Sequence, residues 1–272
     1  MRFNLNELRI GPAYPLTLIG GPCQAESPEL CLQVGTALRD VCAGLGINYV
    51  FKASFDKANR SSIHTPRGPG LEAGLAMLGD VRRALGVPVT TDIHAPEQAA
   101  PAAAAGVDLL QIPAFLCRQT DLLVAAARSG VAVNVKKGQF MAPAEMRNVV
   151  TKLEEAGAAG VMLTERGTFF GYHRLVNDFV GVQELMSLGP PVCFDATHSV
   201  QHPGGGGDRT AGDRAAAPGL ARAAVALGVH ALFIETHPDP ENAASDAAVM
   251  MRLEDTLSLL PKLAALAQLS NS

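Results

Sequence analysis

Residues 131–165 read VAVNVKKGQFMAPAEMRNVVTKLEEAGAAGVMLTE, and this stretch decides the fold. It begins with a short β-branched run, VAVNVK, and ends with a second one, GVMLTE. The segment between them, AEMRNVVTKLEEAG, carries its apolar residues at helical spacing. Two buried strands joined by an amphipathic helix predict a parallel strand–helix–strand unit.

The same unit recurs along the chain. Strand-length apolar runs lie at residues 16–20, 48–53, 87–92, 107–112, 131–136, 160–165, 191–196 and 231–236, with helical segments that include 30–45, 71–85, 144–157 and 220–228. Eight strands alternating with helices in 272 residues predict one (β/α)8 barrel domain, a TIM barrel, over residues 1–272. Residues 1–14 are expected to form a short N-terminal β-hairpin that closes the bottom of the barrel.

A doubly wound open sheet is the nearest alternative, since it shows the same alternation of strands and helices. The chain has the length of eight units, and no GxGxxG motif follows the first strand. These two observations favour the barrel.

Composition excludes several classes of function. A net charge of −4, no tryptophan and 5% aromatic residues argue against a nucleic-acid-binding protein. No apolar run approaches the roughly 18 residues of a membrane-spanning helix, and MRFNLNELRI lacks an apolar signal core, so a cytoplasmic protein without membrane contact is expected. Five cysteines without a CxxC motif argue against a disulfide framework.

A barrel places its chemistry at the C-terminal ends of its strands. Those ends read GGPCQAES, KASFDKANRSS, TDIH, QIPAF, NVKKGQ, TERG, DATHS and ETHPDP, and they hold most of the chain's distinctive polar residues. The loops that lead into the strands, such as GLGIN and RSG, are short and contain few residues with catalytic side chains. The active site is therefore expected at this one face.

A metal site is one interpretation of the strand ends. Cys23, His198 and Glu235 follow or end the first, seventh and eighth strands, which are neighbours in a closed barrel, and Asp246 follows the eighth. A thiolate, an imidazole and carboxylates suit Zn2+, Fe2+, Mn2+ or Co2+. Spacing alone leaves open that Cys23 is a core thiol and Asp246 a helix N-cap.

A second group at the strand ends is cationic: Lys52, Lys57, Lys136, Lys137 and Arg166. Several cations at one barrel mouth indicate a ligand with more than one negative charge, such as two phosphates or a phosphate and a carboxylate. Strand alternation lets only one of Lys136 and Lys137 face the interior, and we expect it to be Lys136. Solvated lysines are the alternative.

Other polar residues leave two interpretations open. Asp92, Asp195 and His94 can bind hydroxyls or move protons, although aspartates at strand ends also cap loops. The glycine-rich segment QHPGGGGDRTAGDR, residues 201–214, is longer than a tight turn and is typical of a lid that closes over a substrate.

The strings GPCQAES, FKASFDKANRSS, TDIH, QIPAFLCRQTDLL, NVKKGQF, TERGT, FDATHSVQ and ETHPDP resemble the 3-deoxy-D-manno-octulosonate 8-phosphate synthases, and the likeness extends over residues 15–262. This resemblance implies a homotetrameric (β/α)8 enzyme that condenses phosphoenolpyruvate with D-arabinose 5-phosphate for lipopolysaccharide. The alternative is the sister family that makes 3-deoxy-D-arabino-heptulosonate 7-phosphate from erythrose 4-phosphate. That sister family carries a KPRTS-type loop, against which KANRSS argues.

Site residues follow from the same resemblance. The cysteine of GPC implies the metal-dependent branch, with one divalent ion per subunit held by Cys23, His198, Glu235 and Asp246. Phosphoenolpyruvate is expected at Lys52, Lys57, Gln111, Lys136 and Arg166, and the pentose phosphate at Asn59, Arg60 and Ser61 with Asp92 near its hydroxyls. Lys136, His198 and Asp92 are the expected catalytic residues. Arg118 is expected to reach the phosphate site of a neighbouring subunit. Residues 211–220, AGDRAAAPGL, depart most from the family pattern.

Overall fold

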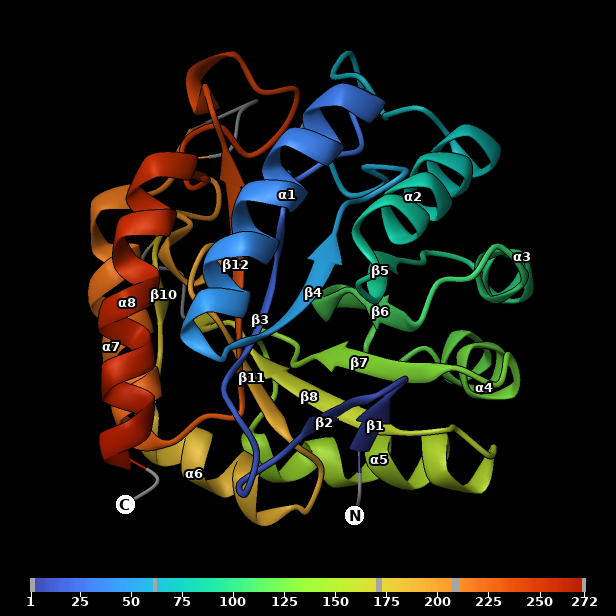
Figure 1. Ribbon diagram of the computed structural model, residues 1–272. Coiled ribbons are helices and arrows are strands. Elements are labelled where there is room, and N and C mark those ends of the chain that lie inside the picture. Colours follow the sequence, from blue (N-terminus) through green and yellow to red (C-terminus); the bar gives the residue numbers. More distant parts are fainter. Residues whose placement is uncertain (1–2, 61–62, 170–172, 207–210, 271–272) are drawn as a thin grey trace.

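The structure, a computed structural model, describes residues 3–60, 63–169, 173–206 and 211–270. Within these residues eight parallel strands form one sheet: β3 (Thr17–Gly21), β4 (Asn48–Lys52), β5 (Val89–Asp92), β6 (Leu109–Ile112), β7 (Ala132–Lys136), β8 (Val161–Glu165), β11 (Val192–Asp195) and β12 (Ala231–His237). Neighbouring strands pair in the order β11-β8-β7-β6-β5-β4-β3-β12, and β11 also pairs with β12. The sheet therefore closes on itself (Figure 1), which confirms the (β/α)8 barrel and excludes the open sheet.

The helices lie around the outside of the barrel (Figure 1). They are α1 (Pro28–Leu45), α2 (Leu71–Leu85), α3 (Ala99–Ala104), α4 (Thr120–Arg128), α5 (Met146–Glu155), α6 (Phe179–Ser187), α7 (Ala217–Leu227) and α8 (Leu253–Ser270). Two short strands, β9 (Thr168–Phe169) and β10 (Leu175–Val176), pair with each other beyond β8, and β13 (Met251–Arg252) extends the edge of β12.

Every barrel strand lies within two residues of its predicted position. The largest differences are at β5 and β6, which begin at Val89 and Leu109 where the apolar runs begin at residues 87 and 107. The strands were predictable because both of their faces are buried, one in the barrel and one under the helices, so each appears as a continuous apolar run.

Local signals fix where the helices begin and end. The Ser27 side chain accepts a hydrogen bond from the Leu30 amide at 3.1 Å and caps α1, and Pro28 occupies the first turn. Gly46 ends the same helix in the left-handed region, at φ 67°. The chain turns there and enters β4 at Asn48 after one further residue.

The N-terminal hairpin seals one end of the barrel, as predicted. Strands β1 (Phe3–Leu5) and β2 (Leu8–Ile10) pair in antiparallel fashion. Their buried side chains join the cluster inside the barrel, which includes Ile19, Val50, Leu109, Met162 and Phe233. The Asn48 side chain, at the first residue of β4, donates from Nδ2 to Arg9 O at 3.1 Å, so the hairpin lies at the N-terminal ends of the strands. The opposite end stays open for the site.

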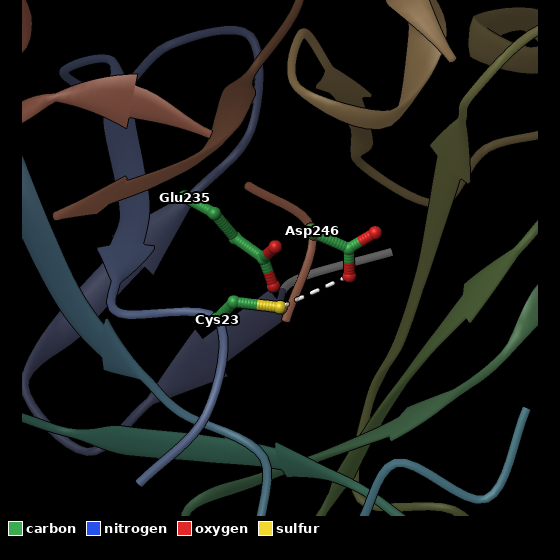
Figure 2. A group of neighbouring side chains, drawn as sticks. All are labelled: Cys23, Glu235 and Asp246. Carbon is green, nitrogen blue, oxygen red and sulfur yellow. Dashed lines mark hydrogen bonds between the residues drawn. The ribbon is translucent and has the colours of Figure 1, made fainter. Parts of the chain in front are cut away.

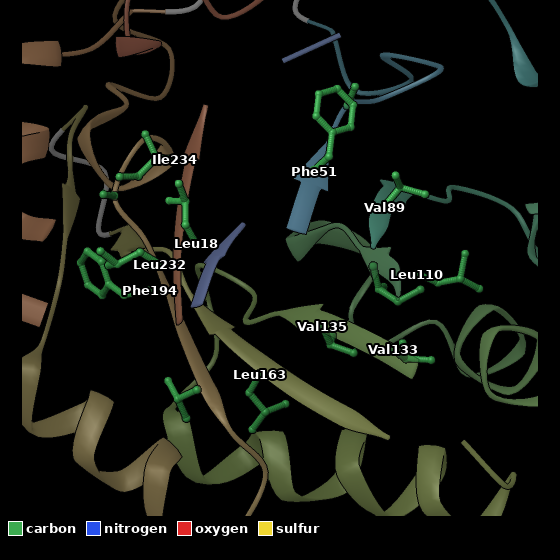
Figure 3. Close-up of a cluster of buried hydrophobic side chains, with 14 of the residues drawn as sticks. Leu18, Phe51, Val89, Leu110, Val133, Val135, Leu163, Phe194, Leu232 and Ile234 are labelled. Carbon is green, nitrogen blue, oxygen red and sulfur yellow. The ribbon is translucent and has the colours of Figure 1, made fainter. Parts of the chain in front are cut away.

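A second apolar core lies between the strands and the helices (Figure 3). It contains outward-facing strand residues such as Leu18, Phe51, Leu110, Val133 and Leu163, all buried. The five cysteines are buried and free, which agrees with the absence of a disulfide framework. Among the described residues no helix combines the length and apolarity needed to cross a membrane.

Helix α2 packs so closely on the loop after β4 that Gly74 leaves no room for a side chain. A Cβ at Gly74 would lie 2.3 Å from Phe55 Cβ, whereas one at the exposed Gly44 of α1 would meet nothing within 4 Å. We expect Gly74→Ala to lower the free energy of unfolding by about 1–3 kcal/mol through overpacking. Gly44→Ala should leave it unchanged or raise it, since alanine favours the helix. Chemical denaturation of both variants measures the difference, and equal stabilities would contradict the packing.

Candidate active site

A cavity of about 550 Å3 opens at the C-terminal ends of the strands. Most of the predicted site residues line it: Lys52, Lys57, Asn59, Arg60, Asp92, Gln111, Lys136, Arg166, His198, Glu235 and Asp246. Arg118 does not, because it is exposed and borders a separate hollow beside Glu145 and Lys152. Ser61 lies outside the described residues. The predicted residues thus come together from across the chain.

Lys52 is bound to acidic side chains on both sides. Its ammonium lies 2.5 Å from Glu235 Oε1 and 3.7 Å from Asp92 Oδ1. Burial by itself lowers the pKa of Lys52, but Glu235 and Asp92 outweigh burial and hold that pKa above its ordinary value. For the carboxylate of Glu235 the signs are reversed: burial raises its pKa, and the charges of Lys52 and neighbouring cations lower that pKa well below its ordinary value. Both groups are therefore charged at neutral pH.

Ser54 joins three members of this network and was missing from the residues predicted from sequence. Its hydroxyl accepts hydrogen bonds from Lys52 at 2.9 Å and Lys57 at 3.1 Å, and it donates to Asp92 at 2.9 Å. A signal was available, because Ser54 follows Lys52 by two residues and strand alternation puts both on one face. His94 also lines the cavity, with its Nε2 3.6 Å from Asp92 Oδ2.

Three of the four predicted metal ligands form a compact group (Figure 2). One potential ligand atom from each of Cys23, Glu235 and Asp246 lies within 4.8 Å of the others. The Cys23 thiol donates to Asp246 Oδ2 at 3.1 Å. Burial, followed by the charge of Glu235, raises the pKa of this thiol well above its ordinary value. The thiol is therefore protonated, and a bound divalent metal ion would be needed to release its proton.

His198, the fourth predicted ligand, stands beside this group. Its Nε2 is 3.5 Å from Glu235 Oε2, and its Nδ1 is 2.8 Å from Asp195 Oδ2. A carboxylate that accepts the Nδ1 proton leaves Nε2 with a free lone pair, the arrangement common for histidine ligands. Asp195 thus orients the imidazole. Of the two interpretations of this aspartate, binding to the protein's own loop is favoured over contact with a substrate.

The backbone at Asp246 is unusual. The residue has φ 52°, in the left-handed region, and no helix begins there, so the N-cap alternative is wrong. Its carboxylate also accepts a hydrogen bond from Gln201 Nε2 at 3.3 Å, while Gln201 Oε1 accepts one from Arg166 at 2.6 Å. Gln201 therefore connects the cationic side of the cavity with the thiol–carboxylate group. In the sequence, Gln201 stands out only as the first residue of the predicted lid.

A divalent cation fits the donor set. Glu235 Oε2 is buried and has no hydrogen-bond partner among the described residues. Glu235 belongs to the compact group with a thiol and a second carboxylate, and His198 Nε2 lies 3.5 Å from Glu235 Oε2, so sulfur and oxygen donors are grouped with an imidazole nitrogen beside them. That mixture suits borderline ions such as Zn2+ or Fe2+ and is unsuited to Ca2+.

Two guanidinium groups of the cavity have unused donors. Arg60 Nε and Arg166 Nη1 are buried without a hydrogen-bond partner in the described part of the chain. The lysines differ, since Lys52 and Lys136 are bound to carboxylates, the latter to Asp195 at 2.7 Å. A buried donor without a partner is costly. The two arginines are therefore the groups best prepared to receive anions.

The loop that carries Lys57, Asn59 and Arg60 is closed by a clamp at its base. Arg67 makes two hydrogen bonds to the Asp56 carboxylate, of 2.9 and 2.5 Å, and Arg67 O accepts the Lys57 amide at 2.7 Å. The glycine-rich segment after β11 has a similar stem, in which Gln201 pairs with Gly212 and the His202 amide donates to Ala211 O. Residues 207–210 of the predicted lid lie outside the described residues.

The chain is similar to known proteins over nearly its whole length. Residues 2–270 match the DAHP synthetase I family. The chain is similar to three proteins named 2-dehydro-3-deoxyphosphooctonate aldolase: one from Cyanothece sp. at 55% identity (96% of this chain, 95% of the relative), one from Methylobacterium radiotolerans at 53% (98% and 94%) and one from Protochlamydia amoebophila at 48% (96% and 94%).

The Asp56–Arg67 clamp should stabilise the fold in a pH-dependent way. Its hydrogen bonds hold the pKa of Asp56 below the ordinary value, so the stabilisation is present above about pH 4 and is lost as the pH falls below it. Arg67→Met should lower Tm at pH 7, and the difference from wild type should shrink toward pH 3. Arg83→Met, which removes an exposed pair with Asp80 on α2, is the control and should have little effect. If Arg67→Met lowered Tm by the same amount at pH 3 and pH 7, the stabilising role of the Asp56–Arg67 ion pair would be contradicted.

Proposed function

The chain belongs to the DAHP synthetase I family, and from that premise we propose that it condenses phosphoenolpyruvate with D-arabinose 5-phosphate and water. The products are 3-deoxy-D-manno-octulosonate 8-phosphate and inorganic phosphate. The names of the relatives favour this reaction over the use of erythrose 4-phosphate.

One observation carries the proposal from the structural side. Arg60, on the loop after β4, and Arg166, directly after β8, each have a buried guanidinium donor without a partner among the described residues, and both line one cavity. Because the two guanidinium groups come from two separate elements, the cavity is suited to bind two phosphorylated substrates. The cations between them offset the repulsion of these substrates and allow both to bind at once.

We assign the two substrates to the two sides of the cavity. The carboxylate and phosphate of phosphoenolpyruvate would bind Lys52, Lys57, Gln111, Lys136 and Arg166. The phosphate of the pentose would bind Asn59, Arg60 and Ser61, and its hydroxyls would meet Asp92. Burial raises the pKa of Asp92, but Lys52 and Lys57 outweigh burial and hold it well below the ordinary value, so Asp92 accepts hydrogen bonds.

The reaction then follows from the charges. C3 of the enol phosphate attacks the aldehyde carbon, C2 gains oxocarbenium character, and the former aldehyde oxygen becomes a hydroxyl after protonation. Water adds at C2, and the resulting tetrahedral species expels inorganic phosphate by cleavage of its C–O bond. Lys136 is held by Asp195 and lies 3.4 Å from His198 Nδ1. Its positive charge would stabilise the negative charge of the phosphoenolpyruvate carboxylate and phosphate during the reaction.

We further propose that Cys23, His198, Glu235 and Asp246 hold one divalent ion, Zn2+, Fe2+, Mn2+ or Co2+. When bound, such an ion supplies Lewis acidity that orients an aldehyde oxygen or lowers the pKa of a water molecule. Around it, Asp195 fixes the His198 ring and Gln201 fixes the Asp246 carboxylate. The protein's own residues thus prepare the donor geometry.

Assembly and location complete the proposal. We propose a single-domain subunit in a cytoplasmic homotetramer, because Arg118 is exposed and lies away from its own cavity, where it can serve a neighbour. Light scattering on the purified protein measures the subunit number.

Release of inorganic phosphate tests the proposed reaction directly. Phosphoenolpyruvate with arabinose 5-phosphate should give phosphate and the eight-carbon product, detected by mass spectrometry. Erythrose 4-phosphate in the same assay should react at least about tenfold more slowly, because the KANRSS loop differs from that of the sister family. Faster turnover of erythrose 4-phosphate would overturn the choice of acceptor.

The metal is tested at Cys23. Cys23→Ala should lose metal, measured by elemental analysis, and nearly all activity, because it removes the sulfur donor while the barrel stays folded by circular dichroism. Cys42→Ala is the matched control: this thiol is buried in α1, its pKa is raised by burial to about 12, and its loss should spare metal and turnover. Full activity after chelation of wild type would refute metal dependence.

A further inference from the structure

Lys137 and Glu165 form a buried ion pair that has no place in the reaction described above. Lys137 Nζ lies 3.6 Å from Glu165 Oε2, and their side chains are 1% and 3% exposed. Neither residue lines the cavity. Desolvation largely offsets the attraction within a buried pair, and apolar residues of similar volume often stabilise a protein as well. Stability alone therefore gives a weak reason for these two charges.

The pair stands directly behind two residues of the cavity. Lys136 ends β7 and Glu165 ends β8, so Lys137 and Arg166 are the residues that follow. Successive side chains along a strand point to opposite faces. Lys136 and Arg166 line the cavity, whereas Lys137 and Glu165 are buried and do not line it. The Lys137 amide donates to Thr164 O at 2.8 Å, which continues the β7–β8 ladder to this level.

The pair also holds both loops that leave these strands. The Lys137 ammonium donates hydrogen bonds to three acceptors: Gly138 O at 3.3 Å, Met141 O at 3.3 Å and Thr168 Oγ1 at 3.2 Å. Glu165 Oε1 accepts the Gly167 amide at 2.6 Å. Gly167 turns the chain immediately after Arg166, at φ 97°. One buried pair thus determines how the backbone leaves both strands.

We propose that Lys137 and Glu165 are positioning residues that set the separation and direction of Lys136 and Arg166 to match the phosphate and carboxylate of phosphoenolpyruvate. The inference rests on the proposed function, which places this substrate at these two cations. The pair is neutral as a whole, so it adds little net attraction for anions. Its effect is geometric, and a small displacement of a binding group lowers affinity strongly.

Lys137→Met and Glu165→Gln test the proposal. Lys137→Met keeps the length of the side chain but removes three donors, and it should weaken phosphoenolpyruvate binding roughly tenfold or more, in calorimetric Kd and in KM. Glu165→Gln keeps an acceptor for Gly167 and should have a smaller effect. KM for arabinose 5-phosphate should change less than about threefold in both. Lys262→Met, the same substitution on the exposed surface of α8, should change neither.

The double variant Lys137→Met with Glu165→Leu covers the case in which a single variant, with an unpaired buried charge, fails to fold. It should fold with a Tm close to wild type and still bind phosphoenolpyruvate weakly. Wild-type affinity in a folded variant, or an equal loss for both substrates, would overturn the positioning role. Wild-type enzyme that does not turn over the two substrates would instead refute the proposed function, so the two failures are distinguishable.

Discussion

The ion pair between Lys52 and Glu235 is the interaction on which the rest of the site depends. Its atoms are 2.5 Å apart, and the two side chains are 2% and 1% exposed. Removing either partner would leave a buried charge uncompensated, a severe cost. The same ammonium donates to Cys23 O, so one group joins β4, β12 and the loop after β3. Glu235 also belongs to the thiol–carboxylate group, and the cationic group and the thiol–carboxylate group of the cavity therefore share one carboxylate.

Barrel closure makes this sharing possible. Strand β12 pairs with β3 on one side and with β11 on the other. Residues at the C-terminal ends of these three strands are consequently neighbours, although Cys23 and Glu235 stand at opposite ends of the sequence. The hairpin at the other end fills the barrel with apolar side chains. Polar chemistry is thereby confined to one face, as is general for this fold.

The sequence predicted the strands and the charged residues at their C-terminal ends because both depend on local pattern. An apolar run identifies a strand, and its last residues must lie at the rim. Pattern does not reveal which partner a side chain selects there. The hydrogen bond that orients His198 toward Glu235 depends on Asp195, and the role of Gln201 depends on two residues from other elements. Arg67, which had no role by sequence, closes the loop of Asn59 and Arg60 through Asp56.

Two lysines and two arginines of the cavity differ in their partners, and the difference bears on how anions are recognised. Lys52 and Lys136 are bound to carboxylates, so their charges are fixed in place before any ligand arrives. Arg166 is held by the neutral amide of Gln201, and within the described part of the chain Arg166 and Arg60 each have one buried donor without a partner. An incoming phosphate can therefore bond to the arginines without breaking an ion pair. Under the proposed function, the compact ammonium groups of the lysines supply the field and the planar guanidinium groups of the arginines supply the directed contacts.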